Sequence, residues 1–122
     1  MKKTVLVVLM TVLALFAVSA ESIDLGDFPV GKWLDAEYDA VWTFSAETIQ
    51  LYMTDGSLVF DFKDKVEDFD VKGSMKGVEL SFSCDETGRD YTFIKGVTNM
   101  DLEMIIDRDN GQHYETDLTF RK

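Results

Sequence analysis

The sequence predicts an all-β protein, in which an antiparallel up-and-down meander of eight or nine short strands closes into a small barrel after a signal peptide. The first observation is that apolar residues after residue 30 recur at every second position, with polar residues between them. Successive side chains of a strand point to opposite faces, so this alternation indicates one packed face and one solvated face, as in antiparallel sheets. No helical stripe interrupts the pattern, and glycine-containing turn signals divide it at short intervals.

The alternation can be followed along the chain. The expected strands carry apolar residues on a shared face at 42–44, 49–53, 58–62, 69–71, 78–84, 102–106 and 114–120. The segment 78–84 is the clearest, with apolar residues at its even positions and Glu or Ser at its odd ones. Asp68 breaks the phase before Phe69, which we interpret as a β-bulge, with an inward-facing acid as the alternative. The only proline, Pro29, precedes the first strand.

Two dipeptides are strong hairpin signals. Asp55-Gly56 and Asn110-Gly111 suit two-residue type I′ turns, which need positive φ at both central positions. Other corners are expected at glycines 73, 77, 88 and 96. Short connections of this kind favour a barrel, which removes exposed strand edges, over a two-sheet sandwich with Greek-key crossovers.

The first twenty residues have the composition of a secretory signal. Lys2 and Lys3 give a positive start, residues 4–18 are almost entirely apolar, and Val18-Ser19-Ala20 offers a small-residue cleavage site. The alternative, an uncleaved anchor, is disfavoured because the run is short and no Lys or Arg follows it closely. We therefore expect an exported protein, periplasmic or secreted, with no stable membrane insertion after cleavage.

The chain divides into residues 1–20 as signal peptide, 21–30 as an N-terminal lead-in and 31–122 as the β-barrel domain. Its formal net charge of −11 disfavours nucleic-acid binding, because such a chain repels phosphate backbones. The only cysteine, Cys84, continues the apolar phase of its segment and is expected to be buried. A single cysteine forms no internal disulfide, and we expect a monomer stabilised by apolar packing.

A family resemblance begins where the β pattern begins. Gly31-x-Trp33 at the start of a predicted meander barrel resembles the signature of the lipocalin and calycin group, and specifically small bacterial lipocalin-like proteins. The resemblance implies that Trp33 plugs one end of the barrel and that Arg121, after the last strand, packs over it. It also implies a non-enzymatic binding module.

The sequence offers no constellation for catalysis. His113 is the only histidine and follows a turn, so we interpret it as a surface residue rather than a base. One Cys and one His do not supply a zinc site of the Cys and His type, and the spacing in 107–111 does not fit a calcium loop. We predict no catalytic residue, metal or cofactor, and hence no enzyme.

The remaining candidate feature is the apolar content of the barrel interior. The candidate ligand-binding residues are Trp42, Phe44, Leu51, Phe60, Phe82 and Met104. They fit a pocket for a small hydrophobic ligand or, equally, the solid core that a domain without disulfides needs. The two functional hypotheses are therefore a binding module for a small apolar ligand or an exported protein partner, and a filled-barrel structural, interaction or inhibitor protein of the bacterial cell envelope.

Overall fold

The computed structural model describes residues 22–121 and confirms an all-β architecture. Its nine strands are β1 (Gly31–Asp35), β2 (Ala40–Ser45), β3 (Thr48–Met53), β4 (Leu58–Asp61), β5 (Glu67–Ser74), β6 (Gly77–Cys84), β7 (Arg89–Gly96), β8 (Leu102–Arg108) and β9 (His113–Arg121). Every paired neighbour is antiparallel, as the alternating pattern predicted. The expected signal peptide, residues 1–20, lies outside the described residues.

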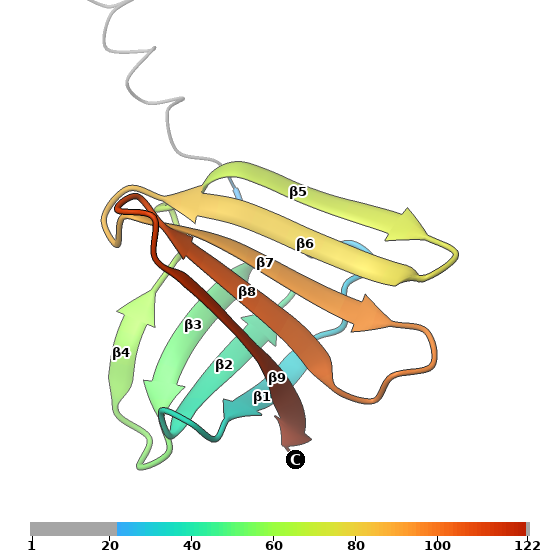
Figure 1. Ribbon diagram of the computed structural model, residues 1–122, viewed down its shortest axis with the longest axis horizontal. Coiled ribbons are helices and arrows are strands. Elements are labelled where there is room, and N and C mark those ends of the chain that lie inside the picture. The colour runs from blue at the N-terminus through green and yellow to red at the C-terminus, as the bar shows by residue number, and fades with distance from the viewer. Residues whose placement is uncertain (1–21, 122) are drawn as a thin grey trace, which may run out of the picture.

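The strands form one curled sheet in the order β4-β3-β2-β1-β9-β8-β7-β6-β5. Strands β1 to β4 pair consecutively, and so do strands β5 to β9. In addition β1 pairs with β9, which leaves β4 and β5 as the two edges of the sheet. Figure 1 shows β5–β8 across the upper part of the view, β1–β4 below them, and β9 running between the two groups. The sheet is thus a meander that curls on itself. Its edge strands β4 and β5 do not pair with each other, so no backbone ladder closes the sheet into a barrel.

The seam between the edge strands β4 and β5 has a buried connection at one end. The chain turns there between β4 and β5, with the N–H of Phe62 donating to the Ile49 carbonyl at 2.9 Å and the N–H of Lys65 donating to the Phe62 carbonyl at 3.0 Å. Phe62 and Val66 are 1% and 0% exposed. The seam therefore gains apolar burial, which does not require the strands to be in hydrogen-bonding register.

The inward faces of the two groups of strands meet in an aromatic core. The ring of Trp42 on β2 lies 5.1 Å from that of Phe93 on β7, measured between centroids, and 5.6 Å from that of Tyr91. Phe44 lies 5.0 Å from Phe93 in an edge-on contact. Cys84 is buried and free, as expected. Aromatic packing across the interior therefore holds the curled sheet together without a disulfide.

The segment before β1 packs into this core. Ile23, Leu25 and Phe28 are all nearly fully buried. The Leu25 N–H donates to the Ala46 carbonyl at 3.3 Å, and the Phe28 ring lies 5.2 Å from that of Phe44. The segment covers the end of the sheet at the β2–β3 turn, so only the opposite end is left for a cavity.

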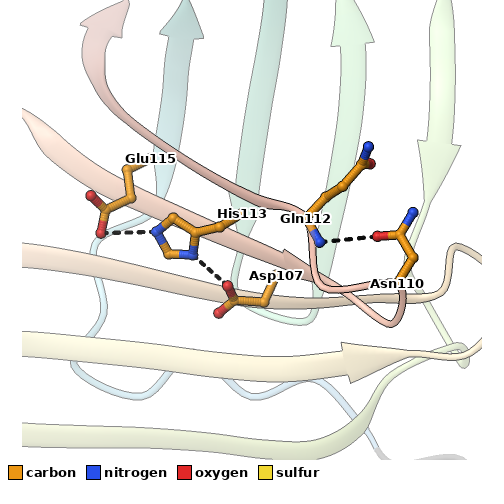
Figure 2. A network of polar contacts seen from close by, with 5 residues as sticks. All are labelled: Asp107, Asn110, Gln112, His113 and Glu115. Atoms are coloured by element: carbon orange, nitrogen blue, oxygen red, sulfur yellow. Dashed lines mark hydrogen bonds and ion pairs between the residues drawn. The ribbon is translucent and has the colours of Figure 1, made fainter.

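The two predicted hairpins form, but their geometry differs from the prediction. Only the glycines, Gly56 and Gly111, have positive φ, at 94° and 88°, so the turns are not type I′. Each connection spans four residues, and its glycine N–H donates to the carbonyl three residues back, Gly56 to Met53 at 3.0 Å and Gly111 to Arg108 at 2.9 Å. A turn followed by a glycine of positive φ is the pattern of a longer hairpin loop. The Asp55 and Asn110 side chains also accept hydrogen bonds from the backbone N–H two residues on, at 2.8 and 3.0 Å. Figure 2 shows the contact of Asn110 with Gln112.

The interpretation of Asp68 as a bulge is confirmed. The register between β5 and β6 shifts between Glu67 and Asp70, and Asp68 itself is exposed with φ of 52°. A bulge inserts an extra residue and bends its strand. The first part of β5 is therefore bent where it faces the seam with β4.

Candidate functional site

The end of the sheet opposite the N-terminal segment contains a cavity of about 560 Å³. It lies where β1 and β8 end and where β2, β7 and β9 begin. This volume is within the usual range of about 300–1,000 Å³ for small-molecule pockets. The apolar part of its wall consists of Ala40, Trp42, Leu51, Tyr91, Met104 and Ile106.

A buried acid lies in the β1 side of this wall. Asp35 is 2% exposed and accepts a hydrogen bond from the backbone N–H of Glu37 at 3.0 Å. The hydroxyl of Tyr114 lies 3.2 Å from Oδ2 of Asp35 and 2.8 Å from Oε2 of Glu37. One hydroxyl proton serves one acceptor at a time, so the two carboxylates share a single donor. Burial and the hydrogen bond to Glu37 raise the pKa of Tyr114, so this hydroxyl stays protonated at neutral pH.

Two arginines lie in the part of the wall formed by β7 and β8. Arg89 begins β7 and Arg108 ends β8, and their Cα atoms are direct partners in the β7–β8 ladder. Nε of Arg89 is buried and has no hydrogen-bond partner among the described residues. Burial raises the pKa of Tyr91, and the adjacent positive charge of Arg89 acts in the opposite direction. The Arg89 guanidinium therefore lies beside the Tyr91 hydroxyl within the wall.

His113 stands at the rim of the cavity with acidic neighbours. Nδ1 contacts Asp107 on β8, and Nε2 lies 3.3 Å from Oε1 of Glu115 on β9, as Figure 2 shows. These two carboxylates raise the pKa of His113, the hydrogen bond to Asp107 being the larger cause. The imidazole is about half exposed and has no hydroxyl or thiol among these contacts. The arrangement is that of a surface ion pair rather than a nucleophile and its base.

The residues predicted to face the interior divide between the cavity and the core. Trp42, Leu51 and Met104 line the cavity. The other three do not belong to its lining and pack against further rings. Phe44 contacts Phe93, Phe60 lies 4.6 Å from Phe62, and Phe82 stacks on Tyr91 at 5.0 Å.

The residues of the lipocalin-like signature lie together, with one exception. Gly31 has φ of 144°, and a Cβ added there would come within 2.9 Å of the Phe120 ring. The ring that packs on Trp33 is also that of Phe120, with centroids 5.2 Å apart. Arg121 instead pairs with Lys32 and lines a groove on the outer surface. The expected arginine over Trp33 is therefore replaced by a phenylalanine, because alternation along β9 turns the next residue to the other face.

The polar residues of the cavity were not predicted from the sequence. Asp35 stands at the end of its strand, and Arg89 and Arg108 continue the inward phase of the apolar residues two positions away. This spacing could have predicted the arginines as cavity residues. A charged residue two positions from an inward-facing apolar residue, at the end of a strand, is expected at the mouth of a barrel. Tyr114 belonged to a predicted strand, but nothing in the sequence indicated its contact with Asp35.

Fold and site together define a curled antiparallel meander with one covered end and one cavity at the other end. No protein-family model, curated protein or solved structure matches the chain. Residues 22–121 bring together no group of three His, Cys, Asp or Glu side chains suited to a metal ion. A search of the same residues finds no helix with the length and apolar character needed to cross a membrane.

Proposed function

We propose that this protein is a non-enzymatic binding module of the lipocalin-like kind, which holds a small, largely apolar ligand in the end cavity. The observation that carries the proposal is the cavity itself, about 560 Å³ in volume with Trp42, Leu51 and Met104 in its wall. Ligand pockets are concave and mostly apolar, with a few polar groups that fix orientation, and this wall has that composition.

The test uses a neutral solvatochromic dye, Nile red, and two matched substitutions on β8. Ile106 lines the cavity, whereas Ile105 is on the opposite face of the same strand. Ile106→Trp fills the cavity and is expected to weaken dye binding about tenfold, equivalent to ~1.4 kcal/mol. Ile105→Trp is expected to leave it unchanged. An absence of saturable binding, or equal effects of the two substitutions, would refute the proposal.

We also propose that the sheet closes as a barrel through the seam between β4 and β5. The support is the burial of Phe62 and Val66 and the contact of Phe60 with Phe62. Amide hydrogen exchange tests it, because amides on the facing edges of β4 and β5 exchange slowly only when water is excluded from the seam. Exchange at the rate of exposed turns would show an open sheet.

Export of the mature protein as a monomer belongs to the same proposal. It rests on the signal-like composition of residues 1–20. Intact-mass measurement of the protein from a cell envelope or culture supernatant tests it, with a first residue near Glu21 as the expected result. A full-length chain retained in the cytoplasm contradicts export, and a larger hydrodynamic mass contradicts the monomer.

A second candidate is an interaction protein that binds an exported partner. The observation that favours it is the edge strand β4, where Leu58 and Val59 are 55% and 49% exposed. An edge strand with exposed apolar side chains suits pairing with another chain. Crosslinking in intact cells, with the wild type and Val59→Lys compared, distinguishes this candidate, since a partner held by β4 is lost from the variant.

A further inference from the structure

We propose that the cavity is specific for amphipathic anions, whose negatively charged head group lies between Arg89 and Arg108 while the apolar body extends toward Trp42 and Met104. This inference rests on the proposed binding function. It adds the chemical class of the ligand, which neither the volume of the cavity nor its apolar wall determines.

The first step in the argument is the placement of the two arginines. They are cross-strand partners with both side chains in the cavity wall, and directly opposed residues of antiparallel strands have Cβ atoms about 4.5–5.5 Å apart. Like charges in that position destabilise a sheet. The chain has only three arginines, so two of the three stand in this one unfavourable pair.

The second step is the lack of compensation within the protein. The chain contains 23 Asp and Glu residues, yet neither arginine forms an ion pair with a carboxylate in the part of the chain that the structure describes. Nη1 of Arg108 donates to the neutral amide of Gln112 at 2.8 Å, and Nε of Arg89 is buried without a partner. A buried donor left unpaired is costly, and a carboxylate is the acceptor that matches a guanidinium best.

The nearby acid Asp35 does not pair with the arginines. It accepts hydrogen bonds from the Glu37 backbone and from the Tyr114 hydroxyl, and that hydroxyl also lies 2.8 Å from Oε2 of Glu37. The acids of β1 and of the β1–β2 turn therefore interact with Tyr114, and the arginine pair has no carboxylate partner among the described residues.

The depth of the cavity gives the shape of the ligand. Arg108 is at the mouth, and Ile106 and Met104 follow it inward on the same face of β8. A strand rises about 3.3 Å per residue, so the Cα atoms of Arg108 and Met104 are separated by roughly 13 Å along β8. A medium-length alkyl or an aromatic body with one terminal carboxylate spans that distance.

The experiment varies the head group and keeps the tail. Displacement of Nile red is measured with decanoate, decanol and decyltrimethylammonium, each below the concentration at which it forms micelles. The expected result is that decanoate displaces the dye at least about tenfold more tightly than either of the others. The overall charge of −11 favours the ammonium compound at long range, so preference for the anion requires a local positive site.

The variants assign that preference to the arginine pair. Arg89→Gln with Arg108→Gln is expected to weaken decanoate binding about tenfold or more and to leave decanol binding unchanged, which also shows that the cavity is still folded. Arg121→Gln is the matched control, because Arg121 lines the outer groove and not the cavity. It removes one positive charge from the chain and is expected to have no effect on decanoate.

The outcomes separate the two proposals. Tight binding of decanol or of the ammonium compound, with no advantage for decanoate, overturns the anion specificity and leaves the binding function standing. An equal loss in Arg121→Gln attributes the preference to net charge and also overturns it. Failure of all three compounds to displace the dye, or of the dye to bind at all, overturns both.

Discussion

Replacing Leu25 with alanine tests whether the segment before β1 is a structural part of the domain. Its side chain is 1% exposed, in the core cluster with Phe28, and among the described residues one backbone hydrogen bond, from the Leu25 N–H to the Ala46 carbonyl, joins the segment to the sheet. Leu→Ala at buried sites costs about 2–5 kcal/mol, from lost burial and from the cavity left behind. We expect a loss of about 3 kcal/mol, a large fraction of the ~5–15 kcal/mol that stabilises an ordinary domain.

The assay is urea unfolding followed by the fluorescence of Trp33 and Trp42, both buried in the folded protein. With a slope of about 1–3 kcal/mol per molar urea, the midpoint falls by roughly 1–3 M. The matched control is Val30→Ala in the same segment, where the side chain is 59% exposed, and a change below about 0.5 kcal/mol is expected. Equal effects of the two substitutions would show that the segment contributes nothing to the core, and the reasoning would be wrong.

Three further results are expected from other parts of the fold. Gly77→Ala destabilises the domain by about 1–3 kcal/mol in the same urea assay, because its φ is 145° and the new Cβ meets a β7 carbonyl oxygen at 2.1 Å. Gly73→Ala, which meets nothing within 4 Å, is the control, and an equal loss refutes the steric explanation. By NMR, His113 titrates above its ordinary pKa of 6.5 and moves toward that value in Asp107→Asn. Protonated His113 therefore stabilises the fold fully at pH values below the ordinary pKa, and this stabilisation is lost as the pH rises through the raised pKa of the folded protein. The same His113 pKa in the wild type and in Asp107→Asn contradicts the ion pair. The Cys84 thiol, 1% exposed, reacts with a disulfide reagent slowly in native protein and rapidly in denaturant, whereas equal rates would place it at the surface.

Much of the sheet was predictable because local alternation determines which face of a strand is buried. In β6 the apolar phase of residues 78–84 matches the observed burial, with Leu80, Phe82 and Cys84 almost completely buried. The bulge at Asp68 was visible as a break in the same phase. These features depend on neighbouring residues only, and a single sequence contains that information.

The hairpins and the first segment show where local reasoning was insufficient. Asp-Gly and Asn-Gly marked the turns, but only Gly56 and Gly111 adopt positive φ, so the loops are longer than the predicted two residues. Residues 22–26 alternate only briefly, with apolar Ile23 and Leu25, and Phe28 falls outside that phase, so the burial of all three had no sustained periodic signal. Their burial follows from the position of the segment at one end of the sheet, which is a property of the whole fold.

The sequence by itself determined most of the strands, their packed faces and the absence of an internal disulfide, because each follows from residue type and spacing along the chain; for β7 it indicated only the glycine corners at 88 and 96. The tertiary structure alone decided that β1 pairs with β9 and that β4 and β5 become the edges. It also decided that Arg89 and Arg108 are direct partners in the wall of the cavity and that Tyr114 reaches Asp35. The reason is that such contacts join residues far apart in the chain, and their formation depends on how the sheet curls and on which side chains fill its interior.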